Sequence, residues 1–170
     1  MTEKKGRGRP KGAPNKPKME LITQSKILQK DADVYEILCQ AEIVAQKDAS
    51  LAAQGLRVFG QGNGGVKAVL QWAFSPEINS TLPEGKTPYG SNEAPASDLT
   101  ETSLRFEHKM FKYFVTEQVP TNKRENLWIG LLEGIPKKEA ELIDLVKDGV
   151  WMFPNITKHI AKEAFPEINI

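Results

Sequence analysis

Apolar residues recur every three or four positions along most of the chain, a spacing typical of amphipathic α-helices. From residue 19 onward, charged residues separate short groups of leucine, isoleucine and valine. No stretch alternates apolar and polar residues over five or more positions, as a half-buried strand would. The pattern therefore predicts an all-α fold, a compact multi-helix domain over residues 19–170.

Glycine, proline and capping residues divide this pattern into separate helices. The first apolar stretch predicts two helices, or one helix interrupted near residues 31–33. The further expected helices cover residues 49–59, 66–74, about twenty residues from 99, 121–135, 136–146 and 155–164. Pro136 suits the first residue of its helix, Lys147 and Gly149 suit the end of that helix, and Asn155 suits a cap. The segment from residue 99 has the strongest period, with Leu99, Phe106, Met110, Tyr113 and Phe114, so we expect it at the centre of the core.

A long loop is predicted between the helices. Residues 76–98 combine four prolines and two glycines with polar residues, which excludes regular helix or central strand. Loops longer than about 15 residues in compact domains are usually either functional or mobile. Because Ile78, Leu82 and Tyr89 can anchor this loop to the helices, we expect a pinned loop rather than a mobile one.

The glycine-rich stretch over residues 60–65 has the order G-x-G-x-x-G found in dinucleotide-binding loops. Such a site also needs a buried strand before the glycines and an acidic residue on a second strand about 20 residues later. Neither is expected here, because residues 56–59 favour helix and residues 82–85 read Leu-Pro-Glu-Gly. We interpret the glycines as a hinge between two helices, with a phosphate-binding loop as the alternative.

Charge is divided unevenly along the chain. Residues 1–18 contain seven Lys and Arg and one Glu, a balance of +6, so the total of +1 leaves −5 for residues 19–170. The first 18 residues also contain three prolines and almost no apolar side chain, which predicts a disordered basic N-terminal tail. An acidic body repels phosphate, so we expect any nucleic acid to meet the tail.

The tail contains the order Arg7-Gly8-Arg9-Pro10, flanked by lysines. This order resembles an AT-hook, a short peptide that lies along the minor groove of A·T-rich double-stranded DNA. The resemblance implies that the two arginines enter the narrow, electronegative groove, that the glycine allows close approach and that the proline favours an extended backbone. The expected DNA-binding residues are Lys4, Lys5, Arg7, Gly8, Arg9, Pro10 and Lys11. The alternatives are a tail that attracts nucleic acid without selectivity and a functionally silent tail.

Candidate catalytic and metal-binding residues are few. Cys39 is the single cysteine, which excludes a disulfide framework and a cysteine-rich zinc site and suits a reducing compartment. His108 and His159 have no second ligand at metal-binding spacing, and Asp144 and Asp148 resemble a solvated helix face more than a nuclease pair. No nucleophile elbow, P-loop lysine or H-E-x-x-H occurs. We therefore predict no enzyme, no cofactor and no metal.

Tryptophan positions suggest both core and surface roles. Trp72 and Trp128 lie in helical apolar stripes and are predicted core residues. Residues 151–153, Trp-Met-Phe, fall in a short link between helices and are predicted to form an exposed patch for a partner. No apolar run approaches the roughly 18 residues that cross a bilayer, so we expect no membrane partner.

Several short segments recur in the order seen in one known family. They are Leu82-Pro83-Glu84-Gly85 with Pro88-Tyr89, Lys123-Arg124-Glu125 before Trp128, Ala140-Glu141-Leu142, Val146-Lys147-Asp148 and Glu163-Ala164-Phe165-Pro166. Over residues 56–170 the chain thereby resembles uncharacterised proteins of T4-like tailed bacteriophages. The resemblance implies a viral product in the host cytoplasm or the virion, but no activity. It does not include the first forty residues.

Together these observations predict a phage-encoded accessory protein that tethers a helical, acidic body to A·T-rich DNA through its tail. The body is then available to a protein partner of transcription, replication or packaging. The alternative is a structural or adaptor protein of the virion or of a host-directed complex, with a tail that binds polyanions without selectivity.

Overall fold

The computed structural model describes residues 27–91 and 102–170, and over these residues it contains seven α-helices, one 3-10 helix and no strand. The helices are α1 (Val34–Ala45), α2 (Ala49–Gln61), α3 (Gly64–Phe74), α4 (Leu104–Glu107), the 3-10 helix η1 (His108–Tyr113), α5 (Thr121–Gly134), α6 (Lys137–Val146) and α7 (Lys158–Ala164). The predicted all-α fold is confirmed for this part of the chain. The basic tail, residues 1–18, lies outside the described residues.

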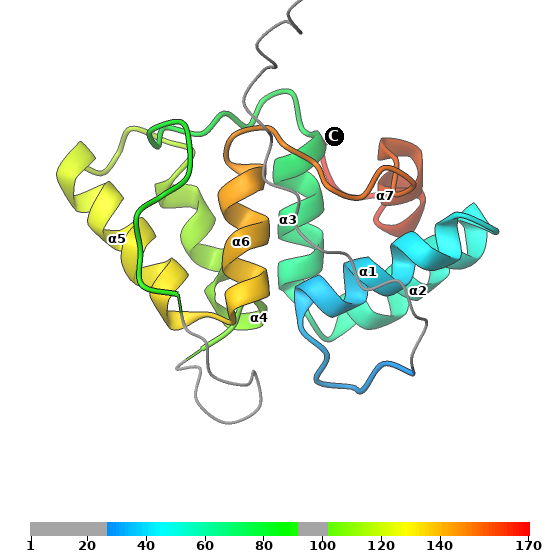
Figure 1. Ribbon diagram of the computed structural model, residues 1–170. Coiled ribbons are helices and arrows are strands. Elements are labelled where there is room, and N and C mark those ends of the chain that lie inside the picture. The colour runs from blue at the N-terminus through cyan, green and yellow to red at the C-terminus, as the bar shows by residue number, and fades with distance from the viewer. Residues whose placement is uncertain (1–26, 92–101) are drawn as a thin grey trace, which may run out of the picture.

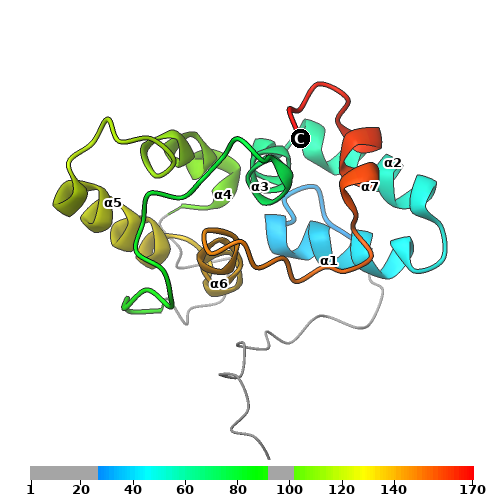
Figure 2. The same ribbon diagram turned by 90° about the horizontal axis from the view of Figure 1, so that it is seen from above.

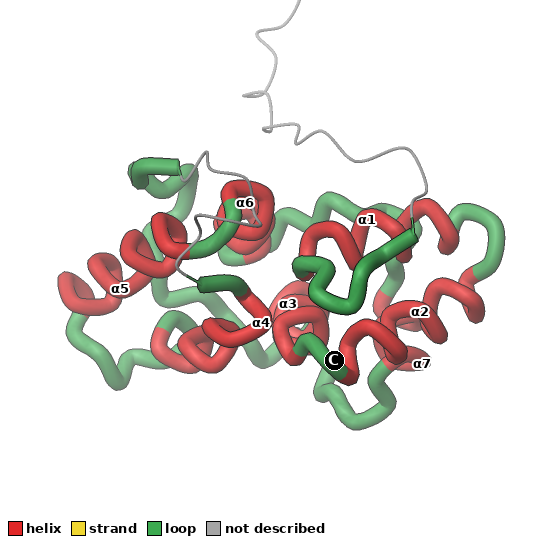
Figure 3. The backbone as a smooth tube through the Cα atoms, turned by 90° about the horizontal axis from the view of Figure 1, so that it is seen from below, coloured by secondary structure: helices red, strands yellow, loops and turns green. Residues whose placement is uncertain are grey.

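Helices α3 and α6 lie side by side at the middle of the molecule (Figure 1). Helices α1, α2 and α7 lie to one side of this pair, and α4 and α5 lie to the other, a division that the view from above also shows (Figure 2). Coloured by secondary structure, the backbone alternates helix with loop throughout its described part (Figure 3). One cluster of buried apolar side chains connects the two sides.

Aromatic rings fill the side of the core that faces α5. Trp128 packs edge to face on Phe114 and Trp72, with ring centroids 4.9 and 5.9 Å apart, and Trp72 packs on Phe111 at 4.9 Å. Edge-to-face pairs add to the burial of these large apolar surfaces. Both tryptophans are buried, so their predicted core positions are confirmed.

The helix boundaries follow local chemistry. Asp33 accepts a hydrogen bond from the backbone N–H of Glu36, and Glu36 bonds back to the Asp33 N–H, so a capping box begins α1 where an interruption was expected. Pro136 precedes α6, and Gly149, with a φ of +71°, stops the chain just after that helix. Both ends of α6 were therefore correctly predicted.

The glycine-rich stretch joins α2 to α3, as the hinge interpretation requires, and the element directly before it is a helix rather than a strand. Asn63 caps α3 by accepting a hydrogen bond from the Gly65 N–H at 3.1 Å. A Cβ atom added to Gly60 would lie 2.4 Å from the Phe165 ring, and one added to Gly65 would lie 2.7 Å from the Leu104 carbonyl oxygen. These two glycines allow close packing of other parts of the chain, which gives them a structural role.

The prediction of a long central helix from residue 99 is wrong. Helix α4 has only four residues and passes directly into the 3-10 helix η1, while Phe106 is 65% exposed. His108 Nδ1 lies 3.1 and 3.0 Å from the carbonyl oxygens of Leu104 and Arg105, where it competes with the backbone N–H groups of a continuing α-helix. Leu99 lies outside the described residues.

Asn155 does not cap the last helix. Thr157 caps α7 instead, and its side chain accepts from the Ile160 N–H at 3.3 Å. Asn155 donates from Nδ2 and from its backbone N–H to the buried carboxylate of Glu42, at 2.6 and 3.0 Å. The Asn155 side chain, which was expected to cap α7, therefore binds the Glu42 carboxylate of α1 instead.

The exposed aromatic patch predicted at residues 151–153 is also wrong. Phe153 is fully buried, and Trp151 packs on it and on Phe74 with ring centroids 5.1 and 5.2 Å apart. The Trp151 indole N–H donates to the Ile156 carbonyl oxygen at 3.0 Å. The aromatic side chains of this link between α6 and α7 therefore pack against the core.

Candidate functional site

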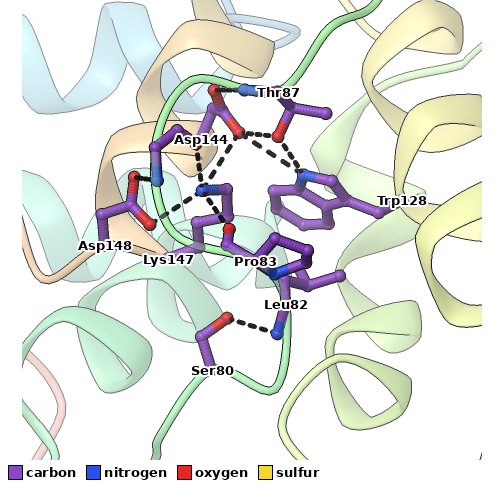
Figure 4. Close-up of polar contacts among 9 residues, drawn as sticks. Ser80, Leu82, Pro83, Thr87, Trp128, Asp144, Lys147 and Asp148 are labelled. Carbon is purple, nitrogen blue, oxygen red and sulfur yellow. Dashed lines mark hydrogen bonds and ion pairs between the residues drawn. The ribbon is translucent and has the colours of Figure 1, made fainter. Parts of the chain in front are cut away.

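The seven predicted DNA-binding residues, Lys4, Lys5, Arg7, Gly8, Arg9, Pro10 and Lys11, lie outside the described residues. Within the described part, polar side chains converge where α5 and α6 meet the loop over residues 82–88 (Figure 4). This group, here called the loop clamp, consists of Lys147, Asp144 and Asp148 from the α6 end, Thr87 from the loop and Trp128 from α5.

Lys147 lies at the centre of the loop clamp. Its side chain is 1% exposed, and its ammonium donates to the carbonyl oxygens of Pro83 and Gly85 at 3.1 and 2.7 Å and to Asp148 Oδ1 at 2.8 Å. Asp144 Oδ1 lies a further 3.8 Å away. An ammonium has three protons, so these three acceptors satisfy it completely. Lys147, which was expected at the end of α6, therefore also holds the loop in place.

Asp144 accepts hydrogen bonds from two sides of the clamp. Its Oδ2 accepts from the Thr87 backbone N–H at 3.0 Å, and its Oδ1 accepts from the Thr87 hydroxyl. The Trp128 indole N–H donates to the Thr87 oxygen at 3.1 Å and points toward Asp144 Oδ1 at 3.4 Å. Asp144 is buried, so the prediction of a solvated helix face is wrong for this residue, because the loop covers it.

The described part of the loop, residues 76–91, is pinned as predicted. Leu82 is buried, and Ile78 and Tyr89 are partly buried against the core. Gly85 has a φ of +91°, a conformation that favours glycine, and its N–H donates to Asp148 Oδ2 at 3.1 Å. Burial raises the pKa of Tyr89 to about 12, so its hydroxyl stays neutral.

A cleft of about 200 Å³ opens between the clamped loop and α5. Its apolar lining includes Leu82, Pro88 and Ile129 beside the Trp128 ring, and Glu84, Lys86 and Glu125 add charged groups of both signs. Pockets that enclose drug-sized ligands are larger, about 300–1,000 Å³. A single side chain or a short peptide turn would fit this cleft.

The clamp has no group in a state suited to catalysis. Lys147 is a fully bonded ammonium, and Asp144 and Asp148 accept from loop N–H groups, so none is positioned as a general base or nucleophile. Among the described residues, no group of three or more His, Cys, Asp and Glu could hold a metal ion. The arrangement supports binding at a shaped surface.

The other candidate residues lie apart from the clamp. Cys39 is buried on α1 as a thiol. His159 is 85% exposed, with Nε2 3.9 Å from Glu163 Oε2 on the same helix face, the geometry of a surface pair. In the part of the chain that the structure describes, no helix has the length and apolar character needed to cross a membrane.

Sequence reasoning missed the buried carboxylate of Glu139. It is fully buried and accepts from the backbone N–H groups of Val34 and Leu104, both at 2.8 Å, which are the first residues of α1 and α4. A signal was present, because Glu139 precedes Leu142 and Ile143 by three and four positions and so lies in the apolar stripe of α6. An acidic residue in an apolar stripe indicates a buried partner.

Comparison with known proteins gives a family but no activity. No curated protein and no solved structure matches the chain. Residues 46–151 match a family of unknown function, DUF6433. The matched range contains α2 to α6, the loop and the complete loop clamp, and leaves out the basic tail, α1 and α7. Because this range is more than half of the 170 residues, the chain belongs to the DUF6433 family of unknown function.

Proposed function

We propose that this protein is a non-enzymatic accessory protein that tethers its helical body to A·T-rich double-stranded DNA through residues 4–11. The order Arg7-Gly8-Arg9-Pro10 is the observation that carries the proposal. Two guanidinium groups around a glycine match the shape and the negative potential of a narrow minor groove. The resemblance of residues 56–170 to proteins of T4-like tailed phages supports a viral product that acts in the host cytoplasm or in the virion.

The charge distribution supports a body that meets protein while the tail meets DNA. The tail has a balance of +6 and residues 19–170 a balance of −5, so phosphate attracts the first and repels the second. The polar groups of the loop clamp are already satisfied within the protein, and the cleft beside them has the size of a peptide side-chain pocket. The body therefore suits a protein partner of transcription, replication or packaging.

The deciding experiment compares two single substitutions in the tail. Arg9→Ala removes a groove-binding guanidinium, so it should weaken binding and reduce the preference for an A·T duplex over a G·C duplex. Lys16→Ala removes a charge outside the hook, so it should weaken binding to both duplexes slightly and equally. Fluorescence anisotropy with labelled duplexes measures both affinities.

Salt dependence and truncation complete the test. With about three to five phosphates neutralised, the slope of log affinity against log salt should be roughly −3 to −4.5. Deleting residues 1–18 should abolish most of the affinity and leave the helical signal of the body unchanged. If the two substitutions act alike, or if the truncated protein still binds, the tail is not an AT-hook.

The second candidate is an adaptor or structural protein of the virion or of a host-directed complex. The acidic body and the small cleft favour this alternative, because both suit contact with protein. Sedimentation of the protein with purified phage particles, compared with its recovery on intracellular phage DNA, separates the two functions. Recovery with particles alone would favour the adaptor.

A further inference from the structure

An open apolar groove lies between α1 and α2, the two helices that run side by side at one end of the molecule (Figures 1 and 2). Its volume is about 230 Å³. Helix α1 contributes Ile37, Ala41 and Val44, and helix α2 contributes Leu51, Ala52 and Phe59. Leu51 lies at its edge and is 54% exposed, so the apolar lining of the groove continues to the surface.

Gly55 leaves room in the groove. It also lines the groove from α2, and a Cβ atom at this position would meet nothing within 4 Å. Glycine inside a helix costs about 1 kcal/mol relative to alanine. At Gly60 on the same helix the close approach of Phe165 explains the glycine, whereas no contact within the described part explains Gly55. The exposed Gly130 also has no such contact, but Gly55 differs from it because it lines an apolar groove. A neighbouring segment seated in the groove would supply that contact.

The chain itself provides such a segment at the mouth of the groove. Leu28 lines the groove, and Ile27 before it is 89% exposed. Residues 19–26 come immediately before and read Met-Glu-Leu-Ile-Thr-Gln-Ser-Lys, with three apolar side chains in the first four positions. The 18 residues before these are almost entirely polar and basic. The apolar part of the N-terminal segment thus adjoins the apolar groove.

Distance and concentration both favour this occupant. Leu21 is seven residues from Leu28, a span of roughly 10 Å as helix and roughly 23 Å when extended, and α1 and α2 are each about 18–20 Å long. A segment joined to its site through so few residues has an effective concentration on the order of millimolar. A second copy of the chain at micromolar concentration has no such advantage.

We propose that residues 19–26 dock in the groove between α1 and α2, with Leu21 and Ile22 against its apolar lining. Docking covers Ile27 and Leu51 and brings a side chain over Gly55. It also fixes the point where the basic tail leaves the body at about residue 18, which shortens the reach of the tail by at most about 26–29 Å compared with an extended segment. This interaction does not depend on DNA binding by residues 4–11.

The test fills the groove with a side chain introduced on α2, in the full-length protein. Gly55→Leu places a side chain in the groove at a position where an added Cβ meets nothing within 4 Å. Gly130→Leu is the matched control, because the Cβ position of Gly130 on α5 is equally free of contacts. Leu21→Ser with Ile22→Ser removes the docking side chains and leaves the described fold untouched. Circular dichroism establishes that each variant is folded.

Limited trypsin digestion reads the docking directly. Cleavage after Lys26 should be at least about tenfold slower than cleavage after Lys11 in the natural sequence, because docked backbone is protected. Gly55→Leu and the double serine variant should both make the two rates similar, and Gly130→Leu should keep the difference.

Three results would overturn the proposal. The first is equal cleavage rates in the natural sequence. The second is protection that survives both Gly55→Leu and the double serine variant. The third is protection that rises with protein concentration together with a doubling of mass in sedimentation, which would make a second copy the occupant.

Discussion

Replacing Glu139 with glutamine removes a buried charge where three helices meet and keeps the size of the side chain. The carboxylate lies on α6 and accepts from the first backbone N–H groups of α1 and α4. Burial, together with the nearby carboxylate of Asp33, raises its pKa from an ordinary 4.5 to about 7, and the two N–H groups partly oppose this rise. The folded protein therefore holds this proton more tightly than the unfolded chain does.

The sign and size of the effect follow from this difference. Between about pH 4.5 and pH 7 the folded state keeps the proton that the unfolded state releases, so the free energy of unfolding falls as pH rises. The contribution is fully present below pH 4.5 and is lost above pH 7. At 1.36 kcal/mol for each pH unit, the loss is about 3 kcal/mol.

Glutamine at this position cannot titrate, and its NH₂ group faces one of the two backbone donors. These two facing donors have no acceptor, which should lower the free energy of unfolding of the variant by about 1–3 kcal/mol at low pH. As pH rises to about 8, the natural protein loses roughly 3 kcal/mol through Glu139 and the variant does not. The stability difference between the two should therefore shrink to zero or change sign.

Urea unfolding followed by tryptophan fluorescence, repeated from about pH 4.5 to pH 8.5, measures this difference. In the difference between the two free energies of unfolding at each pH, the contributions of the carboxylates that both proteins contain cancel. Glu141→Gln on the same helix, where the carboxylate pairs with Lys138 at the surface, controls for the change in net charge. A difference between Glu139→Gln and the natural protein that stays constant over this range would refute the reasoning.

Four further substitutions test other positions. Lys147→Met should lower the free energy of unfolding by about 3 kcal/mol in urea titrations and speed trypsin cleavage after Lys86, because it leaves two loop carbonyls and the buried carboxylate of Asp144 without their cation. Gly60→Ala should lower the free energy of unfolding by about 1–3 kcal/mol, because the added methyl group clashes with the Phe165 ring. Gly130→Ala, at an exposed position inside α5, should raise it by about 1 kcal/mol, so the two melting temperatures should move in opposite directions. Glu42→Ala should cost about 3 kcal/mol by the same urea assay, because it leaves the backbone N–H groups of Asn155 and Ile156 without their acceptor.

Features that depend on neighbouring residues could be predicted from the sequence. Pro136 and Gly149 set the ends of α6 through their own backbone preferences, and Asp33 caps α1 through a residue three positions away. The apolar stripes of α2 and α3 likewise placed Trp72 in the core. These features require no knowledge of the tertiary fold.

Features that depend on distant residues could not be predicted. The partners of Asp144 lie 57 positions away at Thr87, and those of Glu42 lie 113 positions away at Asn155, so nothing local distinguishes these carboxylates from solvated ones. The prediction of a long helix from residue 99 was wrong for a related reason. Its apolar period was compatible with an α-helix, but the contacts of the His108 ring favour a 3-10 turn.

The loop clamp recognises the loop through main-chain atoms. Lys147 binds two carbonyl oxygens, and Asp144 and Asp148 each bind a backbone N–H, while Thr87 is the one loop residue whose side chain takes part. Substitutions at Glu84 and Lys86 would therefore alter the charge of the cleft without loosening the loop. A family that keeps the clamp could diversify its binding preferences one side chain at a time on a backbone of constant shape.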